Sequence, residues 1–117
     1  MHNYLELKIW QRSRELVKLI YQLTESFPDS QKYGLISQMQ RAAISIPSNI
    51  AEGAGRNTSK DFARFLDIAN GSAFELETQL FLSNDLGYAD TNQVKNIISE
   101  LKEIQKMIFK FRVSLDS

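Results

Sequence analysis

Apolar residues recur every three or four positions along four stretches of the chain, which is the spacing of one face of an α-helix. The stretches cover about residues 7–26, 31–54, 59–86 and 91–115. Their main apolar positions are Ile9, Leu16, Ile20, Leu23 and Phe27; Leu35, Met39, Ala43, Ile46 and Ile50; Phe62, Phe65, Leu66, Ala69, Ala73, Leu76 and Leu80; and Val94, Ile97, Ile98, Leu101, Ile104, Ile108, Phe111 and Leu115. Nothing alternates with a period of two over a useful length, so no β-strand is predicted.

Four helices of this length with short connections predict an all-α fold, an up-down-up-down antiparallel four-helix bundle. The bundle is expected to occupy residues 1–117 as a single domain. In the first stretch the apolar spacing alternates between four and three, which is typical of helices that pack nearly parallel to their neighbours. A long helical hairpin that completes its bundle with a second chain is the alternative that this pattern leaves open.

Proline and glycine mark helix ends and one irregularity. Pro28 is expected to end the first helix, because the residue before a proline is disfavoured in the helical conformation. Pro47 lies inside the second stretch, where it cannot donate to the Ala43 carbonyl and crowds it. We expect a kink there and no break, because the apolar stripe keeps its phase. Gly53 and Gly55 are then expected to end this helix in the left-handed conformation.

The boundaries of the last two helices also follow from local chemistry. Thr58 and Asp61 have the spacing of a capping box, so the third helix is expected to begin there. Gly87 is expected to close it. The fourth helix is expected to begin at Asp90 or Thr91, with residue types that cap helix N-termini.

The composition is that of one globular domain: 117 residues, 43% hydrophobic and 24% charged. The absence of cysteine excludes disulfides and thiolate metal sites. The one histidine, His2, lies in an end expected to be unstructured. The chain therefore offers no well-placed histidine for acid–base catalysis or for binding a metal ion. No apolar run reaches the roughly 20 residues of a membrane span. Together with the lack of a signal-peptide pattern, this predicts a cytoplasmic protein that does not enter membranes.

The formal net charge is zero, but the charges are unevenly distributed. Residues 1–60 carry a surplus of three positive charges, residues 61–88 a deficit of four, and residues 89–117 a surplus of one. An oligomer that repeats a basic segment can form a cationic surface even when each chain is neutral. The candidate nucleic-acid face is Lys8, Arg12, Arg14 and Lys18 with Lys102, Lys106 and Lys110, and a plain solvated surface is the alternative.

A polar stripe runs beside the apolar one on the second helix and faces similar residues on the third. Its members are Arg41, Ser45, Asn49, Glu52 and Arg56, with Glu75 opposite. We interpret it as a structural polar network between the two helices, with a binding groove as the alternative. Carboxylates such as Glu52 and Glu75 need histidine partners in the di-metal bundles, and a serine nucleophile needs a base. No catalytic, metal or cofactor site is therefore predicted, and we expect no enzymatic activity.

A second set of aromatic residues lies off the main apolar stripes. Trp10 and Tyr21 stand with Val17 at helical spacing on the first helix, and Phe74 and Phe81 are seven residues apart on the third. These aromatic residues are interpreted as an oligomer interface, because soluble monomers rarely leave large apolar patches uncovered. A wide core face is the alternative.

The central motif resembles a known family. The run R-A-A-I-S-I-P-S-N-I-A-E-G-A-G-R at residues 41–56 and S-K-D-F-A-R-F-L-D-I-A-N-G-S-A-F-E-L-E-T-Q-L at residues 59–80 resemble the bacterial four helix bundle protein family. Its founding members are encoded in intervening sequences of 23S ribosomal RNA genes. The run W-Q-R-S-R-E-L at residues 10–16 is similar as well, and the resemblance covers roughly residues 5–112.

This resemblance implies a small four-helix bundle without established enzymatic activity, often assembled as a ring-shaped homopentamer. The family is similar to the accessory variability determinant proteins of diversity-generating retroelements, which bind a reverse transcriptase and nucleic acid. We therefore expect a non-enzymatic, homo-oligomeric scaffold that binds structured RNA or DNA, or a nucleic-acid enzyme. The alternative is a protein–protein interaction module with no nucleic-acid role.

Overall fold

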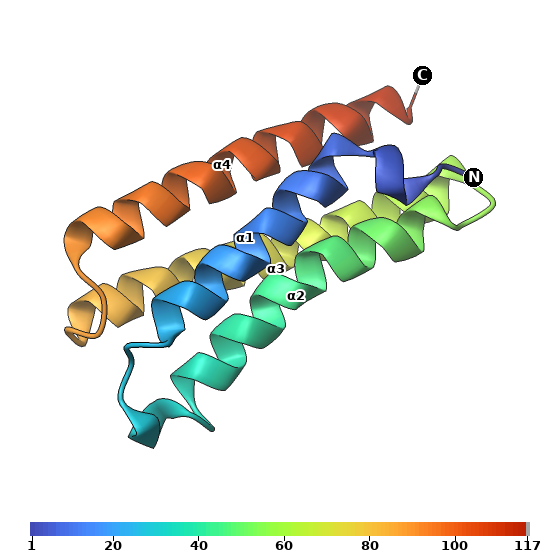
Figure 1. Ribbon diagram of the computed structural model, residues 1–117. Helices are drawn as coiled ribbons and strands as arrows, with labels where there is room; N and C mark the ends of the chain where they lie inside the picture. The colour runs from blue at the N-terminus through green and yellow to red at the C-terminus, as the bar shows by residue number, and fades with distance from the viewer. Residues whose placement is uncertain (117) are drawn as a thin grey trace.

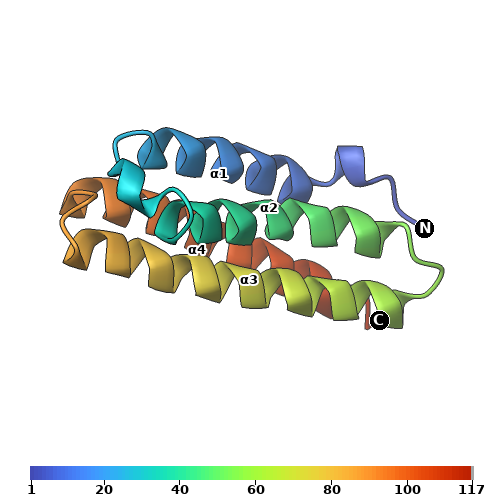
Figure 2. The same cartoon turned by 90° about the horizontal axis from the view of Figure 1, so that it is seen from below.

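The computed structural model describes residues 1–116 of the 117-residue chain. Four antiparallel helices run side by side, and α4 returns to lie against α1 (Figures 1 and 2). The elements are η1 (Tyr4–Glu6), α1 (Lys8–Thr24), η2 (Asp29–Gln31), α2 (Leu35–Ala54), α3 (Ser59–Asp85) and α4 (Thr91–Ser114), where η marks a 3-10 turn. Residues 1–116 contain no strand, so the predicted all-α four-helix bundle is confirmed.

The four predicted apolar stripes meet in the centre of the bundle. Each helix contributes side chains without exposed surface, namely Leu16 and Ile20; Met39, Ile46 and Ile50; Leu66, Leu76 and Leu80; and Leu101 and Ile104. Burying one such side chain contributes roughly 1.5–3 kcal/mol relative to leaving it in water. Each helix packs on two neighbours, so α1 and α3 lie diagonally opposite each other.

The second helix begins later than the apolar pattern suggested. The turn η2 occupies residues 29–31, and Gly34, with φ −114° and ψ −110°, separates it from α2. From Leu35 the helix runs without a break through Pro47, as the continuous apolar stripe predicted. The kink at Pro47 stays a prediction, because an unbroken helix can still be straight or bent.

The glycines at the end of α2 act differently from the expectation. Among residues 1–116 only Gly87 has a positive φ, +79°, and it closes α3 as predicted. Gly55 has φ −83°, so the left-handed ending expected at Gly53 and Gly55 was wrong. Gly53 is instead a contact point between helices: a Cβ atom there would lie 2.7 Å from the Phe65 Cβ and 2.8 Å from the Phe62 Cδ1.

The N-terminal residues are held against the end of the bundle. The backbone N–H of His2 donates to the Ala54 carbonyl over 2.9 Å. Its imidazole packs edge-on against Phe62 and Phe111, with ring centroids 5.2 and 5.6 Å away. The expectation of an unstructured terminus at His2 was therefore wrong, since these aromatic contacts anchor it. No helix within residues 1–116 combines the length and apolar character needed to cross a bilayer.

Candidate interaction surfaces

Part of the predicted polar stripe joins α2 to α3. The hydroxyl groups of Ser45 and Ser72 lie 2.8 Å apart and share a hydrogen bond. The Asn49 amide donates to the Ser45 carbonyl over 2.8 Å and to its hydroxyl over 2.9 Å. These half-buried groups satisfy one another, so this segment is a helix–helix contact of the kind expected for the structural network.

The other predicted members do not extend this contact into one network. Arg56, just beyond the end of α2, and Glu52 in its last turn form an ion pair of 3.4 Å, with both side chains exposed. Glu75 accepts from the Gln79 amide over 3.3 Å within α3. The Arg41 side chain is exposed and forms no ion pair or hydrogen bond with any residue between 1 and 116. The Ser45 and Asn49 part of the predicted network therefore joins α2 to α3, and Arg41, Glu52, Arg56 and Glu75 lie outside that contact.

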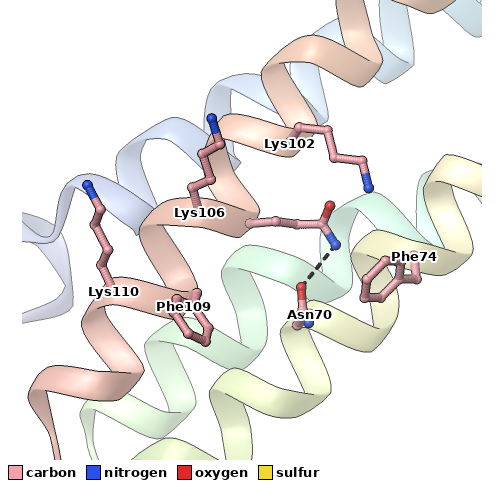
Figure 3. A pocket seen from close by; sticks show the side chains of 7 residues that line it. Asn70, Phe74, Lys102, Lys106, Phe109 and Lys110 are labelled. Carbon is pink, nitrogen blue, oxygen red and sulfur yellow. Dashed lines mark hydrogen bonds between the residues drawn. The ribbon is translucent and has the colours of Figure 1, made fainter.

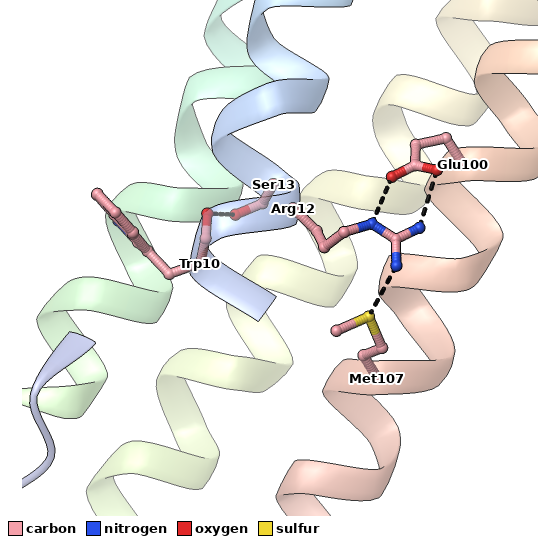
Figure 4. Close-up of polar contacts among 5 residues, drawn as sticks. All are labelled: Trp10, Arg12, Ser13, Glu100 and Met107. Atoms are coloured by element: carbon pink, nitrogen blue, oxygen red, sulfur yellow. Dashed lines mark hydrogen bonds and ion pairs between the residues drawn. The ribbon is translucent and has the colours of Figure 1, made fainter. Parts of the chain in front are cut away.

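Long-range ion pairs connect α4 to its neighbours. Arg12 on α1 donates from Nε and Nη2 to the two carboxylate oxygens of Glu100 on α4, over 2.7 and 2.9 Å, and its Nη1 lies 3.6 Å from the Met107 sulfur (Figure 4). These hydrogen bonds, with a further Coulombic attraction, hold the pKa of Glu100 below its ordinary value against the effect of burial. Arg112 donates in the same two-bond arrangement to the Asp67 carboxylate, over 2.6 and 3.1 Å. Sequence reasoning missed these pairs, whose members are 88 and 45 residues apart.

The cations of the candidate nucleic-acid face on α1 are largely engaged. Arg12 is bound to Glu100, and Lys18 lies 3.4 Å from Glu15. The Arg14 guanidinium stacks over the Trp10 ring at 5.4 Å. Lys8 is exposed and has no ion-pair partner among residues 1–116. The structure therefore does not assemble these four residues into one free cationic row.

The lysines on α4 lie along a groove between α3 and α4 with a volume of about 410 Å³ (Figure 3). Lys102 pairs with Glu77 at 2.8 Å and lies 5.1 Å from the centre of the Phe74 ring. Asn70 and Gln105 bridge the two helices with a hydrogen bond of 3.0 Å. The groove is lined by Asn70, Phe74, Lys102, Gln105, Lys106, Phe109 and Lys110.

A second groove, of about 590 Å³, lies between α1 and α2. Its apolar residues include Trp10, which is half-buried and packs against Tyr4 at 5.1 Å between ring centroids. Its cationic residues are Arg14 and Lys18. The groove is lined by Tyr4, Trp10, Arg14, Val17, Lys18, Ile44, Pro47, Ser48 and Ala51.

The aromatic residues interpreted as an oligomer interface differ in exposure. Phe74 and Phe81 are each 53% exposed, so the wide-core alternative does not describe them. Tyr21 is also exposed, while Trp10 is half-buried beneath Tyr4. Sequence reasoning missed further exposed apolar residues, among them Ile44, Ile68, Leu82 and Phe109.

Comparison with known proteins places this bundle in a family. The sequence pattern of the 23S rRNA-intervening sequence protein family matches residues 5–110. The chain belongs to this family. No curated protein matches the chain. A crystal structure of a protein with unknown function from the S23 ribosomal protein family of Bacteroides thetaiotaomicron is similar over 89% of this chain and 97% of that one, with 28% identity and a TM-score of 0.82.

Proposed function

We propose that this member of the 23S rRNA-intervening sequence protein family is a non-enzymatic helical scaffold that acts by binding other macromolecules, first of all copies of its own chain. The observation that carries the proposal is the 53% exposure of both Phe74 and Phe81 on α3. Aromatic side chains dominate the energetics of protein interfaces. Each one buried between copies contributes roughly 1.5–3 kcal/mol before the entropic cost of association.

A closed ring of identical chains would cover such surfaces without leaving a free end. The proposed number of copies, five, follows from the family resemblance noted above. The same resemblance makes RNA, DNA or a nucleic-acid enzyme such as a reverse transcriptase the proposed binding partners of the assembly. This role needs no cofactor, and the proposed place of action is the cytoplasm.

Light scattering at micromolar concentration tests self-association. A pentamer has five times the 13.4 kDa chain mass, or 67 kDa, and a mass near 13.4 kDa overturns the proposal. Replacing Phe74 and Phe81 together by serine is expected to lower the mass. The matched control is Tyr33→Ser, because Tyr33 is 89% exposed outside the helices. The control is expected to keep the parent mass.

A second candidate function, binding of single-stranded nucleic acid, is favoured by the groove between α3 and α4. Lys102, Lys106 and Lys110 follow one another along its α4 side (Figure 3). Phe109 beside them is 66% exposed. Lysines attract phosphates, and bases stack on exposed aromatic rings. Lys106 has only a distant partner, Glu103 at 3.8 Å, so its charge is available.

Retention of an RNA with single-stranded loops at low salt tests this candidate, because phosphate contacts weaken steeply as salt rises. The variant Lys106→Ala with Lys110→Ala is expected to retain less RNA than the parent. Lys8→Ala with Lys18→Ala, on α1, is the matched control and removes the same charge. Equal loss in both variants would point to a general charge effect, and no loss in either would remove the α3–α4 groove as the site.

A further inference from the structure

The middle of α3 contains a glycine that the bundle itself does not require. Gly71 is exposed, and a Cβ atom built on it meets no atom within 4 Å. Glycine is the least favourable residue after proline inside a helix. Gly71 neither caps α3 nor has a positive φ, in contrast to Gly87. A glycine on a helix surface lets another backbone approach closely, and no backbone of this chain does so.

Exposed apolar residues lie on α3 before and after this glycine. We call the outer α3 face the set Ile68, Gly71, Phe74, Glu75, Phe81 and Leu82. Its four large apolar side chains are between 43% and 53% exposed. Glu75 follows Gly71 by one helical turn, and its carboxylate accepts a hydrogen bond only from the Gln79 amide among residues 1–116. The outer α3 face therefore carries four exposed apolar side chains and one carboxylate, with Gly71 near the end marked by Ile68.

The groove between α1 and α2 has complementary chemistry. Its walls carry the apolar side chains of Trp10, Val17 and Ile44, and Ile44 is 42% exposed. Arg14 and Lys18 lie on its α1 side. Arg41, on α2 one turn before the groove residue Ile44, has no anionic partner within residues 1–116. Complementary charge of this kind directs association and sets its register.

We propose that the outer α3 face of one copy docks into the α1–α2 groove of a second copy of this chain. Gly71 then permits α3 to approach the groove closely, and Glu75 faces the cations of Arg14 and Arg41. The outer α3 face and the α1–α2 groove share no residue, so a copy bound through one surface still offers the other. Such a contact is heterologous and builds a ring when its rotation closes. The inference rests on the proposed self-association and adds which two surfaces meet.

Two variants block the two surfaces separately. Gly71→Leu fills the point of close approach, and because nothing inside the chain lies within 4 Å, the thermal midpoint of the fold should not fall. Ile44→Asp places an anion in the cationic groove on its α2 side. If Ile44→Asp fails to fold, Arg14→Glu replaces it and places the anion on the α1 side of the groove. Each variant is expected to raise the dissociation constant of self-association by at least about tenfold. Ser99→Leu, also a small-to-leucine change on an exposed helix position, is the control and should assemble like the parent.

Mixing the variants distinguishes the possible pairings. Gly71→Leu keeps a working groove and Ile44→Asp keeps a working α3 face. At a concentration where each variant alone is monomeric, an equimolar mixture should therefore form a pair of twice the 13.4 kDa chain mass. A mixture that stays monomeric overturns the inference. A Gly71→Leu variant that assembles like the parent also overturns this inference, but it leaves the proposed self-association intact. A parent protein that is itself monomeric overturns both the proposed self-association and the proposed pairing of surfaces.

Discussion

Arg12 on α1 and Glu100 on α4 are joined by two hydrogen bonds, from Nε to Oε1 over 2.7 Å and from Nη2 to Oε2 over 2.9 Å. The two residues are 88 positions apart in the sequence. A planar guanidinium matches a carboxylate in this way, and a lysine ammonium does not. The pair therefore closes the bundle between its first and last helices and removes Arg12 from the free cations of the surface.

Replacing Arg12 by lysine is expected to destabilise the fold by about 0.5–1 kcal/mol, because the charge remains but the two-bond geometry is lost. The side chains are 41% and 30% exposed, so solvent screening keeps the effect moderate. Urea denaturation of the parent and the variant measures it. Lys18→Arg is the control, since Lys18 pairs with Glu15 within one helix at 3.4 Å and both side chains are 65% exposed. Equal destabilisation in both variants would contradict the role assigned to the two hydrogen bonds between Arg12 and Glu100.

The same pair predicts a dependence of stability on pH. The hydrogen bonds from Arg12 lower the pKa of Glu100 in the folded chain. The contribution of the pair is therefore complete above the unfolded glutamate pKa, about 4.3, and is lost as the pH falls through the lower folded pKa. The free energy of unfolding of the parent minus that of Glu100→Gln, measured from pH 7 downwards, should shrink in this acidic range. A difference that stays constant would contradict the prediction.

Gly53 is expected to be intolerant of a side chain. In Gly53→Ala the new Cβ would lie 2.7 Å from the Phe65 Cβ and 2.8 Å from the Phe62 Cδ1, so α2 and α3 must separate. Overpacking of this kind destabilises by about 1–3 kcal/mol. Gly55→Ala is the matched control, because its Cβ would lie 3.6 Å from the nearest atom, the Glu52 carbonyl oxygen, at a negative φ. Thermal midpoints of the two variants should differ clearly, with Gly53→Ala lower.

The contact between Ser45 and Ser72 is expected to contribute more to stability than the surface pair of Glu52 and Arg56. Ser45→Ala removes a half-buried hydroxyl that bonds Ser72 and accepts from Asn49, at a cost of about 0.5–1.5 kcal/mol. Glu52→Ala removes one member of an exposed local pair at the end of α2, at a cost of about 0.5 kcal/mol or less. Chemical denaturation of both variants decides the order. A larger loss for Glu52→Ala would restore the network that the sequence alone suggested.

Most of the fold could be predicted from the sequence because helix formation and burial are recorded in local spacing. The three- and four-residue spacing of Leu16 and Ile20, and of Leu101 and Ile104, places these side chains on one helix face, and all four are fully buried. Gly87 and the cap at Thr58 are also local features, and both have the predicted roles. Such patterns need no knowledge of which helix lies next to which.

The interaction surfaces were decided by the tertiary structure. Arg12 and Lys8 have the same charge and lie one turn apart, yet only Arg12 meets a carboxylate, because packing of the core sets the rotation and axial position of α1 against α4. The same geometry brings Gly53 against Phe65 and leaves Gly71 uncovered. The sequence by itself determined which residues form helices and a core. The tertiary structure alone decided which charges are paired and which apolar faces stay exposed, since these depend on contacts between segments far apart in the chain.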